Sequence, residues 1–191
     1  MIKFRCASAY PENSETRYEL HHGVIVEMAK PRGEHSDLTG FLIEELLMTI
    51  REAAKRGIWT IPRESIVKPI NDKSGYEPDI IILNQENITR EPRWKSESII
   101  ENASSVKLIV EVVSTNWRDD YYDKFRDYVE LCSSRRVEMG IPEYWMVDYA
   151  ALGGRKFIGN PKQATIFVYE LIDGEYQIRE FRGNKSNPRN K

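Results

Sequence analysis

The sequence predicts an α/β fold with a central mixed sheet flanked by helices and an N-terminal β-hairpin. Two runs, 80–83 and 108–113, are continuously apolar and rich in β-branched residues, as is typical of central strands covered on both faces. Segment 35–56 carries apolar residues three and four positions apart, which predicts a helix with one apolar stripe against a sheet. Short strand patterns before and after these segments complete the sheet.

In chain order, the first element is a hairpin over residues 19–28, because His22-Gly23 supplies a turn before the strand V-I-V-E-M. The helix over 35–56 follows, and Gly57 suits its C-terminal stop. Two short strands are then expected, one near residue 60 and one near residue 66.

The second half continues the alternation of strands and helices. Residues 84–105 are polar, contain Pro92 and are expected to run over the surface. Helical spacing returns over 120–132, and Y-W-M-V-D at 144–148 is the next strand. A C-terminal hairpin is expected to turn at Asp173-Gly174.

The 191 residues, 40% hydrophobic and 30% charged, suit one domain, which we expect over residues 1–183. A polar basic tail over 184–191 follows. The last thirteen residues, 179–191, carry five basic residues and one acidic one and are either a solvated terminus or a nucleic-acid arm. The net charge of −2 gives no global attraction to nucleic acid, so any such binding needs local patches.

Localisation is expected to be cytoplasmic. The two cysteines, Cys6 and Cys132, have no metal-like spacing and fit a reducing compartment. No secretory signal pattern is seen, and no apolar run reaches the roughly 20 residues that span a bilayer, so no membrane partner is expected.

Two carboxylates and a lysine carry the strongest functional signal. Asp79 and Glu111 stand at or within the apolar runs, and Lys124 lies in the helix after the second run. Carboxylates on rigid strands, together with the backbone carbonyl of Val112, suit Mg²⁺, and a nearby lysine can stabilise developing charge. These residues indicate metal-dependent cleavage of a phosphodiester.

Each residue also has a purely structural interpretation. Glu111 can instead form a buried ion pair, and Asp79 can simply mark a strand entry. Asp120 stands four residues before Lys124 and can form a helical salt bridge. His35 can be a capping or solvent residue, and Glu27 alternates with apolar neighbours as a solvent-facing strand residue does. These alternatives stay open from the residues alone.

Five segments together resemble the Uma2 family of endonucleases, earlier known as DUF820 and abundant in cyanobacteria. They are Y-E-L-H-H-G-V-I-V-E-M, E-H-S, E-P-D-I-I-I-L, I-V-E-V-V-S-T-N-W-R-D-D-Y-Y-D-K-F-R-D-Y and G-I-P-E-Y-W-M-V-D. The resemblance extends from about Tyr18 to Arg179. It implies the PD-(D/E)XK nuclease superfamily and a restriction-endonuclease-like fold. One departure is the longer stretch between Tyr128 and Gly140.

The resemblance also implies roles for individual residues. Asp79 and Glu111 match the metal-binding acids. The usual lysine position holds Val113, and Lys124 matches a lysine moved to the next helix. The supporting residues that match family positions are Glu27, His35 and Asp120.

The function implied is a Mg²⁺- or Mn²⁺-dependent DNA endonuclease that acts as a homodimer. The alternative is a catalytically inactive nuclease-fold protein that binds nucleic acid or a protein partner. A third interpretation is a structural module in which Glu111 only pairs with a basic side chain.

Overall fold

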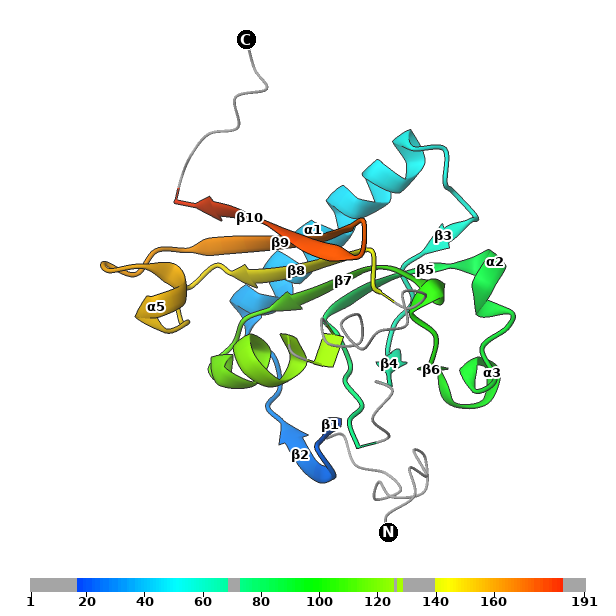
Figure 1. Cartoon of the computed structure of the whole chain (residues 1–191), viewed down its shortest axis with the longest axis horizontal. Coiled ribbons are helices and arrows are strands. Elements are labelled where there is room, and N and C mark those ends of the chain that lie inside the picture. Colours follow the sequence, from blue (N-terminus) through cyan, green and yellow to red (C-terminus); the bar gives the residue numbers. More distant parts are fainter. Residues whose placement is uncertain (1–16, 69–72, 126, 129–139, 184–191) are drawn as a thin grey trace.

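The structure, a computed structural model, describes residues 17–68, 73–125, 127–128 and 140–183 (Figure 1). Its centre is a six-stranded sheet in the order β10-β9-β8-β7-β5-β3. Only β7 and β8 run parallel, and the other neighbouring pairs are antiparallel. The strands are β3 (Trp59–Thr60), β5 (Ile80–Asn84), β7 (Val106–Val112), β8 (Glu143–Asp148), β9 (Thr165–Ile172) and β10 (Glu175–Arg182).

Helix α1 (Gly33–Glu52) covers one face of the sheet, as Figure 1 shows. Its buried Leu46 and Ile50 pack with Ile80, Ile82 and Val110. These sheet residues lie at alternate positions because successive strand residues point to opposite faces. The intervening residues belong to a second apolar cluster on the other face.

The second cluster packs under a short helical segment that follows β7. That segment contains η2 (Asp119–Lys124), which has π-helical geometry. Its Tyr121 and the later Tyr128 join Ile81, Ile109 and Tyr144 in this cluster. Glu111 shares the face of Ile109, so a carboxylate stands inside an apolar layer.

The hairpin of β1 (Arg17–His21) and β2 (Val24–Met28) lies outside the main sheet and beside η2. A third, two-stranded sheet pairs β4 (Ile66–Val67) with β6 (Ile99–Ile100) in parallel. The remaining short elements are α2 (Gln85–Ile88), α3 (Trp94–Glu97), η1 (Ala103–Ser105) and α5 (Arg155–Ile158).

The predicted fold class is confirmed, since a mixed sheet, flanking helices and an N-terminal hairpin are all present. Both predicted turns are found as well. His22 and Gly23, and likewise Asp173 and Gly174, all have positive φ, the conformation that two-residue hairpin turns of type I′ require.

Two details of the prediction are wrong. Helix α1 ends at Glu52 rather than near Gly57, because Ala54 takes a positive φ of 54° and the amides of Ala54 and Lys55 bond back to Arg51 and Ile50. Segment 84–105 is not only a surface excursion, since Ile99 and Ile100 of β6 are buried.

Parts of the predictions lie outside the described residues. These are the end of the helix expected over 120–132, the long stretch between Tyr128 and Gly140, and the tail over 184–191. The single-domain boundary therefore stays a prediction.

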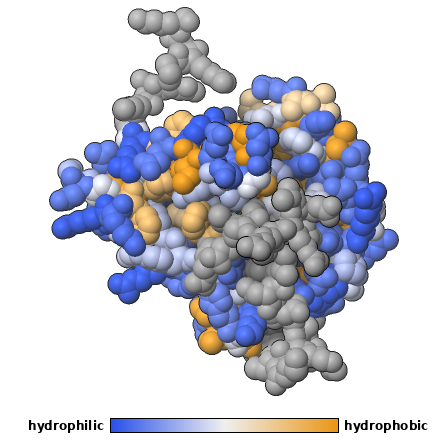
Figure 2. Space-filling view, in the orientation of Figure 1, coloured by the Kyte–Doolittle hydropathy of each residue, from blue (hydrophilic) through white to orange (hydrophobic). Residues whose placement is uncertain are grey.

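Hydrophilic residues cover most of the face seen in Figure 2, and hydrophobic areas are interspersed among them. Among the helices that the structure describes, none combines the length and the hydropathy of a bilayer-crossing segment.

Candidate metal centre

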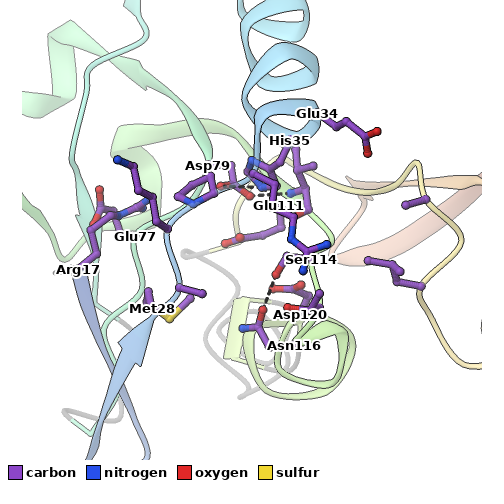
Figure 3. Close-up of a pocket in the computed structure, with 18 of the residues that line it drawn as sticks. Arg17, Met28, Glu34, His35, Glu77, Asp79, Glu111, Ser114, Asn116 and Asp120 are labelled. Carbon is purple, nitrogen blue, oxygen red and sulfur yellow. Dashed lines mark hydrogen bonds and ion pairs between the residues drawn. The ribbon is translucent and has the colours of Figure 1, made fainter.

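A cavity of about 250 Å³, called the central cavity below, opens where three elements meet. The β1–β2 hairpin, the N-terminal end of α1 and the segment after β7 all contribute lining residues. Figure 3 shows Asp79, His35 and Glu111 close together at the end of α1, with Ser114, Asn116 and Asp120 on the other side. All the predicted site residues except Glu27 line this cavity, Lys124 and Val112 included.

The pairing of β5 with β7 brings the two predicted acids together. Ile80 pairs with Val110 in this antiparallel ladder, and extending the register by one residue places Asp79 opposite Glu111. Oδ2 of Asp79 accepts a hydrogen bond of 2.8 Å from the amide of Val112. The peptide that follows Glu111 is therefore held directly by Asp79.

Lys124 lies at the centre of the buried charges. Its Nζ is 3.1 Å from Glu111 Oε2, 3.1 Å from Glu19 Oε1 and 3.7 Å from Asp120 Oδ1. All four side chains are at least about nine-tenths buried. Tyr128 donates a further hydrogen bond of 3.2 Å to Glu111 Oε1. Both oxygens of Glu111 are therefore bonded to groups of the following helical segment.

The π-helical geometry of η2 helps to bring these groups to one side. Asp120, Lys124 and Tyr128 are spaced four residues apart and are all buried. In a regular α-helix such positions drift steadily around the axis, and a wider π-turn counteracts the drift. Such π-turns are frequent at functional sites.

The cluster carries more negative than positive charge, since three carboxylates face one ammonium. Burial raises the pKa of Glu111 well above its ordinary value, and the carboxylates of Asp79, Asp120 and Glu19 add to this rise against Lys124. Burial likewise raises the pKa of Asp120 to about 6. Burial alone would lower the pKa of Lys124, but Glu111 and the other acids outweigh it and raise it well above its ordinary value.

These directions agree on one physical state: Lys124 stays protonated, while burial, reinforced by the neighbouring carboxylates, raises the pKa values of Glu111 and Asp120. Burial would raise the pKa of Glu19 as well, but Lys124 and the hydrogen bonds from His21 and the Glu77 amide outweigh it and lower that pKa. A divalent cation near the cluster would compensate its excess of negative charge. One oxygen is also left over, because Oδ2 of Asp120 is buried and has no hydrogen-bond partner among the described residues.

His35 bridges two of the predicted metal ligands. Its Nε2 lies 3.2 Å from the Val112 carbonyl oxygen and 3.4 Å from Asp79 Oδ1. The bond to Asp79 raises the pKa of His35 above its ordinary value, against burial, which lowers it. A ring N–H thus occupies the space between a carboxylate and a carbonyl oxygen, a position that also suits a cation.

The donor set fits a hard cation. Asp79, Glu111 and the Val112 carbonyl offer oxygen only, and Mg²⁺ typically takes one or two carboxylates and fills its other positions with water and substrate phosphate. Within the described ranges, no group of three or more His, Cys, Asp or Glu side chains is arranged to hold a metal ion by itself.

Basic groups surround the mouth of the cavity. Arg17, Lys30 and Arg32 line it, and the last two are exposed. Helix α1 begins beside them, and its N-cap residue Arg32 makes no side-chain capping bond. Free amides at a helix N-terminus and nearby cations both attract phosphate.

Glu19 and Tyr128 were not identified from the sequence as site residues, although both bond to the Lys124–Glu111 pair. Glu19 Oε2 also lies 2.9 Å from His21 Nε2, and Glu19 Oε1 accepts a hydrogen bond of 3.0 Å from the Glu77 amide. A signal for Glu19 did exist, because it alternates with Tyr18 and Leu20 in a hairpin strand. The sequence does not decide which face of this hairpin is buried.

Glu27 lies on the opposite face of the same hairpin. It pairs with Tyr18, whereas Glu19 pairs with Val26, and directly paired residues of an antiparallel ladder share a face. Glu27 is exposed, and the described residues that line the central cavity do not include it.

Comparisons with known proteins agree with this architecture. The Uma2 family model, described as "Putative restriction endonuclease", matches residues 5–190. A crystal structure described as "a putative nuclease belonging to DUF820 from Anabaena variabilis ATCC 29413" superposes with a TM-score of 0.66 at 17% identity, covering 97% of this chain and 87% of that one. At this identity the likeness shows the fold alone. A comparison with curated proteins found no match.

Proposed function

The chain belongs to the Uma2 family of nucleases, and on this premise we propose that it is a Mg²⁺- or Mn²⁺-dependent endonuclease that hydrolyses phosphodiester bonds of DNA. The observation that carries the proposal is the buried cluster in which Glu111, Asp120 and Glu19 surround Lys124 beside Asp79. Buried charges of this kind destabilise a fold unless they are compensated, so their presence beside an open cavity favours a functional role.

In this proposal Asp79, Glu111 and the Val112 carbonyl hold the cation. A bound divalent cation would polarise a phosphoryl oxygen and lower the pKa of a nearby water. Lys124 remains protonated and stabilises the negative charge that develops as water attacks phosphorus and the 3′-oxygen leaves. Lys30 and Arg32, which line the cavity and are exposed, contact the flanking phosphates of the strand.

His35 and Asp120 have supporting roles. His35 orients Asp79 and the Val112 carbonyl through its Nε2, which contacts both. Asp120 stands 3.7 Å from Lys124 and keeps a second oxygen without a partner among the described residues, so it can accept a hydrogen bond from water. Cleavage of both DNA strands requires two such sites, which is why we propose a homodimer.

A second candidate is a nuclease-fold protein that binds DNA without cutting it. One observation favours it: both oxygens of Glu111 are already bonded, one to Lys124 and one to Tyr128. For Glu111 to bind a cation, at least one of these bonds has to be exchanged. The two candidates therefore differ in whether Glu111 responds to metal.

The deciding experiment is the nicking of supercoiled plasmid with Mg²⁺ or Mn²⁺. Wild type is compared with Asp79→Asn and Glu111→Gln, which keep side-chain shape, and with Glu45→Gln, a control at an exposed acid of α1. We expect nicking that EDTA abolishes, that Glu45→Gln preserves and that each site variant lowers about 10²-fold or more.

Metal binding is measured on the same proteins by Mn²⁺ titration with electron paramagnetic resonance. DNA binding without nicking, together with unchanged Mn²⁺ affinity in Glu111→Gln, would support the non-cutting protein instead. Nicking of equal rate in all variants would indicate a contaminant and overturn the site assignment.

A further inference from the structure

A groove of about 400 Å³, called the side groove below, adjoins the central cavity. Its walls are α1 and the loop from Ile61 to Ser65 between β3 and β4. Arg17, His35 and Asp79 line both hollows. The His35 ring separates them, because its Nε2 contacts the Val112 carbonyl while its Nδ1 is 3.5 Å from Thr39 Oγ1, a side-groove residue.

The lining of the side groove suits a flat, uncharged group. Isoleucine and proline side chains form much of it, at Ile43, Ile61, Pro62 and Pro78. Ser36, Thr39 and Ser65 add hydroxyl groups to these walls. Apolar walls with a few polar groups are typical of sites for small organic groups.

A second phosphate is a poor occupant of this groove. The acids Glu64, Glu77 and Asp79 line it, and of its basic residues Arg17 is already bonded to Glu77 at 3.1 Å. Arg63 is the other arginine that lines the groove; its guanidinium lies 3.9 Å from Glu64, in a pair of exposed side chains, and its own side chain is 93% exposed. An anion inside would meet carboxylates, whereas a guanidinium at the mouth can contact the backbone of a strand whose base points inward.

Two further features of the side groove are an open helix face and a hydroxyl group without a partner among the described residues. Gly40 lies in the middle of α1, where glycine is less favourable than alanine, and a Cβ built there meets nothing within 4 Å. Ser65 is 3% exposed, and its Oγ has no hydrogen-bond partner among the described residues. The groove therefore has open room over one helix face, and a buried hydroxyl that has no partner among the described residues lies in its wall.

From the shared His35–Asp79 wall, the apolar lining and the open space over Gly40, we propose that the side groove binds an unstacked nucleobase of the DNA strand next to the phosphate held in the central cavity. The inference rests on the proposed function for the position of that phosphate. An enzyme that reads an extruded base gains sequence or structure preference from its pocket. The side groove thus selects for strands in which one base can leave its stack.

The test fills the groove from two positions on one helix face. Gly40→Phe and Ser36→Phe place a ring in the groove from exposed sites one turn apart, and Gly40→Ala is the matched control. Binding of short single-stranded DNA is measured by fluorescence anisotropy with Ca²⁺ replacing Mg²⁺. A set of strands carries one abasic site at each successive position. Thermal unfolding by circular dichroism shows which variants are folded.

We expect wild type and Gly40→Ala to bind the intact strand about 10-fold more tightly than the strand with the abasic site at one particular position, the order expected for one stacked base. Folded Gly40→Phe or Ser36→Phe should lose this difference and bind both strands equally. Mn²⁺ affinity should be the same in all four proteins.

The inference is overturned if wild type shows no abasic penalty at any position, or if the phenylalanine variants keep the penalty. Since binding is measured without cutting, a protein that fails to nick plasmid can still show the abasic penalty. The experiment therefore distinguishes a wrong assignment of the side groove from a wrong assignment of the nuclease activity.

Discussion

Removing the ammonium of Lys124 is the most direct perturbation of the buried cluster. In Lys124→Met the stem is replaced by an apolar chain of similar length, and Glu19, Glu111 and Asp120 lose the cation that lies 3.1 to 3.7 Å from them. Each contact at such a distance corresponds to about 5 kcal/mol of Coulomb attraction at an effective dielectric constant of about 20. The desolvation of the ammonium, which is an unfavourable term in wild type, and the protonation of some of the acids in the variant reduce the net effect.

We therefore expect Lys124→Met to lower the free energy of unfolding by about 3–5 kcal/mol at pH 8, the cost of leaving a buried charge without its partner. For a chain of this length that corresponds to roughly 10 °C in Tm. At pH 5 the loss should be smaller. Without Lys124 the folded state holds protons on these acids that the unfolded chain releases above about pH 4, so stability falls as pH rises through that window.

The assay is urea denaturation, followed by tryptophan fluorescence without metal at pH 5 and pH 8. Lys95→Met, at an exposed lysine of α3, serves as the control and should change stability by no more than about 0.5 kcal/mol. The double variant Glu111→Gln/Lys124→Met should recover part of the loss, because it removes one of the unpaired acids. A loss below about 1 kcal/mol, or an equal loss at both pH values, would refute this description of the charge balance.

Two further predictions concern neighbouring residues. Burial raises the pKa of Asp120 from 3.8 to about 6, so its ionised form destabilises the fold above that range. In urea denaturation, the free energy of unfolding of Asp120→Asn should be about 2 kcal/mol higher than that of wild type at pH 8 and equal to it near pH 4. A variant that is less stable than wild type at pH 8 would contradict the sign of this effect. In Gly153→Ala the new Cβ would meet Tyr121 Oη at 2.7 Å and Asp148 Oδ2 at 2.8 Å, separating a hydrogen-bonded pair. Calorimetry should show that Gly153→Ala is about 2 kcal/mol less stable than wild type. Gly40→Ala should be up to about 1 kcal/mol more stable than wild type, because alanine is favoured over glycine inside a helix. Equal effects of the two substitutions would refute the clash at Gly153.

Local sequence patterns predicted the elements whose conformation is decided by neighbouring residues. The apolar runs at 80–83 and 108–113 lie in central strands, and His22-Gly23 and Asp173-Gly174 form hairpin turns. The end of α1 was predicted less well, because a non-glycine residue, Ala54, takes the left-handed conformation there. Such a residue has no sequence signal comparable to that of glycine.

The residue types of the site could also be read from the sequence. A carboxylate inside an apolar strand, as at Glu111, requires a partner wherever it is buried, and this requirement alone makes Glu111 a candidate site residue. The nature of the partner could not be read in this way. Lys124 is in fact bonded to Glu111, and the same lysine also binds Glu19.

The sequence alone determined that acids and a lysine stand at the ends of buried strands and in the next helix, because hydrophobic periodicity is a local property. The tertiary structure decided which of them meet. Strand alternation defines two faces for the hairpin without saying which is buried, and only packing against η2 places Glu19 inside and Glu27 in solvent. The side groove has the same origin, since its walls are distant in sequence and become neighbours only when α1 packs on the sheet.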